Sequence, residues 1–106
     1  MDTQHVDLSR LSGEGPLWGT ASEDLNATVL SWPAGEEVAE HVNRERDVLI
    51  VVIAGSGQAM VGDRACPLHP EHVLLVPKGA RRSIRAGEEG LRYLSIHRRR
   101  GPLQIQ

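Results

Sequence analysis

The sequence predicts an all-β fold, a sandwich or barrel of short strands. Short runs rich in β-branched residues and leucine recur along the chain, and glycine or proline interrupts them at close intervals. No segment repeats its apolar residues with the period of an amphipathic helix. The 106 residues are enough for one domain, and 40% hydrophobic with 25% charged residues is typical of a globular chain. Collagen, long coiled coils and extended disorder are excluded.

The expected strands follow this punctuation. The continuous run 48–53 predicts a strand buried on nearly both faces, after which Gly55 and Gly57 are expected to turn the chain. The run 73–76 is also expected to be buried, and Gly87 and Gly90 are expected to separate the last two strands. In chain order, the eight expected strands cover residues 28–32, 38–42, 48–53, 58–61, 64–68, 73–76, 81–86 and 91–97.

The first 26 residues are interpreted as a lead-in segment. Gly13, Gly15 and Pro16 are expected to prevent a regular element there, while Leu17 and Trp18 are available to dock on the core. We therefore expect residues 1–26 to pack on the barrel or on a partner subunit, and residues 27–106 to form the β-barrel domain.

Charge and hydropathy exclude several classes of partner. Residues 1–53 carry a net charge of −7 and residues 54–106 one of +5, but the basic half lacks the interleaved aromatic residues that stack on bases. We expect no nucleic-acid partner. The longest apolar run, 48–54, is far shorter than the roughly 20 residues of a membrane-spanning helix. Without a signal peptide, and with Cys66 as the one cysteine, a cytoplasmic location is expected.

A pair of spaced motifs makes the fold prediction more specific. Ten positions carry it, in order Gly35, His41, Asn43, Val48, Gly55, Glu71, Pro77, Gly79, Arg82 and Ala86. Their spacing resembles the two conserved motifs of the cupin family, with a short hairpin between them at about residues 56–70. The resemblance covers roughly residues 32–97 and implies a cupin-type double-stranded β-helix, a jelly-roll barrel. It also implies a homodimer, because small cupins typically pair.

The departures from the family pattern concern its metal ligands. The resemblance places two histidines, a glutamate and a third histidine around the metal, and only His41 stands in this chain. Asn43, Val48 and Arg82 occupy the other three positions. Arginine has no lone pair to offer and stays cationic, so it repels a divalent ion. We expect neither the usual metal site nor a bound cofactor.

Two acidic residues leave an alternative metal site open. Glu45 follows Asn43 at a spacing that places it on the same strand face as His41, if the strand extends that far. Asp47 stands one position out of register and would need a bulge to point the same way. The competing interpretation is that residues 44–47 form a solvated polar turn.

The replaced positions indicate a different kind of site. His41, Asn43 and Arg82 are expected to converge in the barrel mouth, where a guanidinium, an amide and an imidazole suit a carboxylate or phosphate. Tyr93 and His97 join them if their face of the last strand points inward. Alternation along the strands predicts apolar walls from Val48, Ile50, Val52, Ile84 and Ala86.

Three functions remain open at this point. The first is a metal-free cupin-like protein that binds a small, anionic molecule. The second is a small cupin enzyme, oxygenase-like or isomerase-like, that uses His41 with Glu45 or Asp47. The third is a structural or partner-binding barrel, in which Arg82 pairs with Glu40, Glu45 or Asp47 and closes the barrel end.

Overall fold

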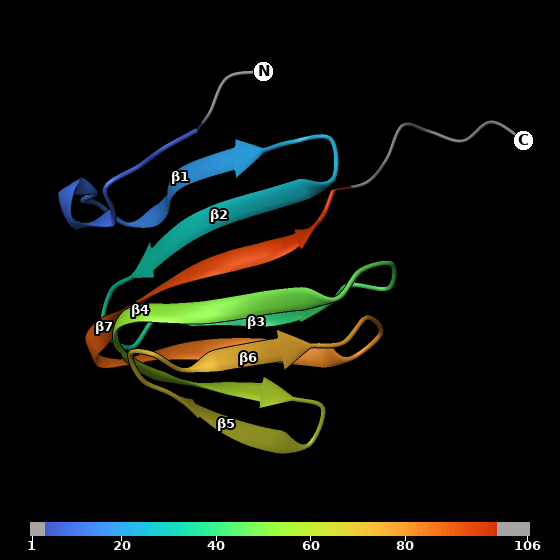
Figure 1. Cartoon of the computed structure of the whole chain (residues 1–106). Coiled ribbons are helices and arrows are strands. Elements are labelled where there is room, and N and C mark those ends of the chain that lie inside the picture. The colour runs from blue at the N-terminus through green and yellow to red at the C-terminus, as the bar shows by residue number, and fades with distance from the viewer. Residues whose placement is uncertain (1–3, 100–106) are drawn as a thin grey trace, which may run out of the picture.

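The computed structural model describes residues 4–99, and this part of the chain is built from β-strands (Figure 1). One short 3-10 turn, η1 (Leu8–Arg10), precedes the strands. They are β1 (Gly15–Ala21), β2 (Leu25–Trp32), β3 (Glu37–Val42), β4 (Val48–Val61), β5 (Arg64–Leu68), β6 (Val73–Val76) and β7 (Arg81–Arg98). The predicted all-β class is confirmed.

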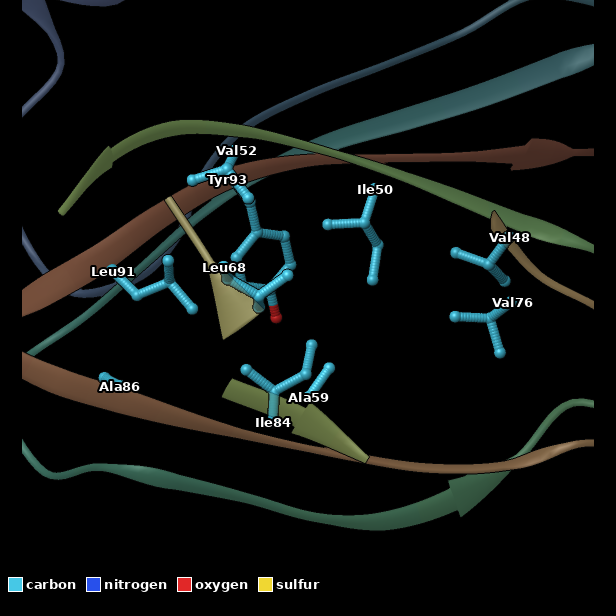
Figure 2. Close-up of a cluster of buried hydrophobic side chains, with 10 residues drawn as sticks. All are labelled: Val48, Ile50, Val52, Ala59, Leu68, Val76, Ile84, Ala86, Leu91 and Tyr93. Atoms are coloured by element: carbon cyan, nitrogen blue, oxygen red, sulfur yellow. The ribbon is translucent and has the colours of Figure 1, made fainter. Parts of the chain in front are cut away.

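The two longest strands, β4 and β7, organise the molecule into two layers. They pair antiparallel along most of their lengths, and each takes part in both layers. One layer contains β1, β2, residues 91–98 of β7, residues 48–55 of β4, and β6. The other contains β3, residues 81–86 of β7, residues 57–61 of β4, and β5. The layers face each other across a space that side chains fill (Figures 1 and 2).

Glycines bend the two long strands without ending them. From the sequence we expected the strands to end and the chain to turn at these glycines. β4 continues through Gly55 and Gly57, and β7 continues through Gly87 and Gly90. Gly55 has a φ of 80°, and a Cβ atom there would overlap the carbonyl oxygen of Gly90. Only glycine satisfies both conditions, so the strands change layer at this crossing without breaking.

The first strand also differs from the expectation. Gly13, Gly15 and Pro16 do not prevent a regular element, because residues 15–21 form β1 and pair with β2. β1 is an edge strand, where a proline without an N–H group is tolerated, and the register shifts between Pro16 and Trp18. β2 begins at Leu25, so the expected boundary between residues 26 and 27 falls within a strand.

The core lies between the layers (Figure 2). The five residues predicted to form its apolar walls are all buried, and Tyr93 joins them at 4% exposure. In Figure 2, Ile50, Val52 and Tyr93 project from one layer toward Ile84 and Ala86 of the other. The core cluster comprises Val48, Ile50, Val52, Ala59, Leu68, Val76, Ile84, Ala86, Leu91 and Tyr93.

β6 is less buried than the sequence predicts. Val76 is buried, but Val73 and Leu75 are 62% and 58% exposed. Within the described residues β6 pairs only with β4, and its alternate side chains point away from the core. The continuous apolar run 73–76 therefore forms a strand with one buried face and one exposed face. None of residues 4–99 forms a helix long and apolar enough to cross a membrane.

Candidate functional site

A cavity of about 350 Å³ opens between the layers, beside β3 and residues 81–86 of β7. Its walls come from strands β2, β3, β4 and β7. The lining residues are Leu30, Trp32, Val38, Ala39, Glu40, His41, Ile50, Arg82, Ser83, Ile84, Tyr93 and Ser95. We call this cavity the barrel pocket. An apolar cavity with a few polar groups is the usual form of a site for a small ligand.

Two of the predicted site residues face each other across neighbouring strands. His41 on β3 is the register partner of Arg82 on β7, and both line the barrel pocket. The pairing of these strands shifts between Val38 and His41, so β3 carries an extra residue there. His41 is exposed, whereas Arg82 is partly buried. The imidazole therefore lies at the mouth and the guanidinium deeper in the pocket.

The Arg82 guanidinium is short of partners. Its Nη1 atom is buried, and no hydrogen-bond partner for it is found within residues 4–99. Burial lowers the pKa of Arg82 from its ordinary value, and the nearby Tyr93 opposes that shift. An arginine keeps its proton under such conditions, so a positive charge lines the pocket, and one N–H group of that cation has no partner within the described residues. Of the three carboxylates considered as partners, only Glu40 lines this pocket.

Tyr93 supplies a second donor to the same pocket. Its hydroxyl oxygen accepts a hydrogen bond from Trp32 Nε1 at 3.1 Å. Because the indole N–H can only donate, the phenol proton remains available for another acceptor. Burial raises the pKa of Tyr93, while the hydrogen bond from Trp32 and the charge of Arg82 act against that rise. The phenol is therefore a neutral donor at physiological pH.

The structure places the other two predicted site residues elsewhere. Asn43 follows the end of β3, and its Oδ1 accepts hydrogen bonds from the backbone N–H groups of Glu45 and Arg46, both at 3.1 Å. His97 is in a separate cavity of about 340 Å³, with its Nδ1 3.5 Å from Arg46 Nη1. Neither residue lines the barrel pocket. The strand face of Tyr93 does point inward, but its pocket ends at Ser95.

The donor set of the pocket does not fit a divalent metal ion. Glu45 and Asp47 line the cavity of His97, away from His41, and Asp47 Oδ1 accepts the backbone N–H of Lys78 at 2.8 Å. Residues 4–99 contain no group of three His, Cys, Asp or Glu side chains placed to hold a metal ion. The positive charge of the partly buried Arg82 would also repel a metal ion.

Trp32 and Ser95 belong to the pocket but were not identified as site residues from the sequence. Trp32 lies on the inner face of β2 with Leu30, and its indole fixes the Tyr93 hydroxyl. Alternation from Tyr93 to Ser95 carries the signal for the serine. For Trp32 the signal was weaker, because the sequence does not show which neighbouring strand meets Tyr93.

Comparison with known proteins identifies the fold. No family model and no curated protein matches the sequence. The structure is similar to that of TT1209 from Thermus thermophilus, with a TM-score of 0.79, 20% identity, and coverage of 91% of this chain and 97% of that one. It is also similar to a cupin protein from Bacteroides fragilis, with a TM-score of 0.75, 17% identity, and coverage of 100% and 92%.

A third neighbour is a cupin superfamily protein from Desulfitobacterium hafniense. Here the TM-score is 0.65 and the identity 27%, over 76% of this chain and 71% of that one. The neighbours share the double-stranded β-helix that the resemblance to the cupin family implied. The cupin-type fold is therefore confirmed.

Proposed function

We propose that this small cupin-like protein binds a small organic anion in the barrel pocket, with Arg82 as the main contact. The observation that supports the proposal most directly is the buried Nη1 atom of Arg82, which lacks a hydrogen-bond partner among the described residues. A buried donor left unpaired costs free energy, and an anion that accepts from it removes that cost. The bond to a guanidinium is also charge-assisted, which makes it stronger than a neutral one.

His41 and Tyr93 extend the set of polar contacts. The phenol proton of Tyr93 is free to donate, and the imidazole of His41 lies across from Arg82 at the pocket mouth. Metal ions have no part in this proposal, because the pocket offers a cation where a metal site needs ligands. The elemental content of protein purified without chelators checks that point, and one metal per chain would contradict it.

Anion-dependent stabilisation tests the proposal. The melting temperature is measured with a panel of small carboxylates and phosphates at constant ionic strength and pH. A ligand that binds only the native protein raises the melting temperature, and the rise grows with the ratio of ligand concentration to Kd. The matched variants are Arg82→Met and Arg85→Met. Arg85 lies on the same strand, with its side chain 69% exposed and 3.6 Å from Glu37.

The outcomes separate the three functions. Stabilisation that Arg82→Met abolishes and Arg85→Met retains supports binding at the barrel pocket. Stabilisation retained in both variants places the anion elsewhere and contradicts the proposal. If no anion stabilises the protein, a structural barrel is favoured. If nuclear magnetic resonance shows that the protein converts a bound anion into a product, the pocket is catalytic.

A further inference from the structure

The barrel pocket combines a few polar groups with mostly apolar walls. Arg82, His41 and the Tyr93 hydroxyl bring polar groups to it, while Leu30, Ile50 and other aliphatic side chains form its walls. From this composition we infer that the ligand is a monocarboxylate with a compact apolar body, such as an aromatic or branched aliphatic acid. The inference rests on the proposed function, because it specifies the anion that the same pocket takes.

The charges around the pocket favour a single negative charge on the ligand. Among the lining residues, Arg82 is the one partly buried cation, and Tyr93 is neutral. His41 and Glu40 are exposed at the mouth, where water screens them. One carboxylate neutralises the guanidinium. A second negative charge in the pocket would lack a buried counter-charge.

The donors also match two oxygens better than three or four. Arg82 offers its Nη1 group, which has no hydrogen-bond partner within residues 4–99, and Tyr93 offers its hydroxyl proton. The hydroxyl-bearing residues Ser83 and Ser95 also line the pocket, but they carry no charge. A carboxylate places two acceptor oxygens in one plane and fits the planar guanidinium. A phosphate places its oxygens tetrahedrally and carries more charge, for which the lining offers one partly buried cation, Arg82.

The size and composition of the walls determine the body of the ligand. About 350 Å³ is near the lower limit of roughly 300–1,000 Å³ for small-ligand pockets, so the ligand is compact. Leu30, Val38, Ile50 and Ile84 are aliphatic, and Trp32 adds an aromatic surface. Burial of an apolar group against these walls is favourable in proportion to its area. A short hydroxylated body would leave that surface uncovered.

Isothermal titration calorimetry with four organic probes tests the inference on the unmodified protein. Benzoate and 3-methylbutanoate have one carboxylate and an apolar body. Benzamide keeps the aromatic body without the charge, and succinate carries two carboxylates on a short chain. Inorganic phosphate completes the comparison. We expect benzoate or 3-methylbutanoate to bind at least about tenfold more tightly than benzamide, succinate and phosphate.

The same titrations on variants locate the site. Arg82→Met should weaken monocarboxylate binding at least about tenfold, Tyr93→Phe about three- to tenfold, and Arg85→Met should leave it unchanged. Urea midpoints confirm that each variant is folded. If phosphate or succinate binds as tightly as the monocarboxylates and needs Arg82, the inference is wrong and the proposed function stands. If benzamide binds as tightly as benzoate, the carboxylate is not recognised and the inference again fails. If no anion binds, both are wrong.

Discussion

Replacing Arg82 with methionine is expected to stabilise the ligand-free protein while it removes anion binding. Methionine keeps an unbranched apolar stem of similar course but has no charge and no N–H group. The variant therefore relieves the cost of the buried Nη1 atom, which has no partner among the described residues. A buried unsatisfied donor costs about 1–3 kcal/mol. Because the rest of Arg82 is only partly buried, we take the lower limit, about 1 kcal/mol.

The expected increase in the free energy of unfolding is measurable in a domain of this size. A change of about 1 kcal/mol shifts the melting temperature of a domain of 60–100 residues by about 4–8 °C. For this chain of 106 residues we expect a rise of about 4 °C and a higher urea midpoint. The fluorescence of Trp18 and Trp32 follows unfolding in both experiments. Functional sites often carry such a cost, and replacing a residue there often exchanges activity for stability.

Arg85→Met is the control for the loss of a charge on the same strand. Its exposed ion pair with Glu37 should contribute no more than about 0.5 kcal/mol, so the control changes the urea midpoint little. If Arg82→Met instead lowers the free energy of unfolding by about 1 kcal/mol or more, the guanidinium stabilises the barrel end. The reasoning would then be refuted, and Arg82 would be a structural residue.

Three further predictions concern the strand crossing, the phenol and the assembly. Gly55→Ala should lower the free energy of unfolding by several kcal/mol or prevent folding. Gly62 has a φ of 59° but open space around it, so Gly62→Ala should lower the free energy of unfolding by only about 1–2 kcal/mol. Equal urea midpoints for the two variants would contradict this. Tyr93 is the one tyrosine, and burial raises its pKa, so absorbance titration should give an ionisation above about pH 10. The free energy of unfolding should then fall as pH rises above about 10, less steeply in Tyr93→Phe; a titration at the ordinary pKa would contradict burial. Light scattering at micromolar concentration should give twice the chain mass of 11.6 kDa, and a value for one chain would contradict the homodimer.

Much of the fold was predictable because it depends on local signals. Short β-branched runs indicated an all-β sandwich or barrel, and the alternation of apolar residues identified the inner face. The cupin type of barrel came from the resemblance of the spaced motifs to that family. What glycine does at a given position was not predictable from the chain alone. A glycine with a positive φ is compatible with either a turn or a bend within a strand. At Gly55 the chain bends and the strand continues, because the backbone of Gly90, distant in sequence, packs closely against it.

The positions of candidate site residues could be predicted where strand pairing determines them, but not where a loop determines them. His41 and Arg82 meet because β3 and β7 pair at these residues. Asn43 has the right spacing but comes after β3, where its side chain caps the backbone of the following turn. His97 has the right alternation, yet alternation fixes the face of a strand and not how far along it a pocket extends.

The position of β3 connects the proposed binding to local stability. β3 carries His41, contains no buried residue, and pairs within the described chain only with β7. Strands with few buried contacts open at a lower free energy than the core strands. A ligand that contacts both His41 and Arg82 adds contacts across this weak pairing. Such a ligand binds more tightly when β3 is paired with β7 than when β3 has opened, so its binding stabilises the pairing. Under the proposed function, the exposed strand at the pocket mouth and the Arg82 guanidinium, whose Nη1 atom has no partner within residues 4–99, form one arrangement that an anion between them would stabilise.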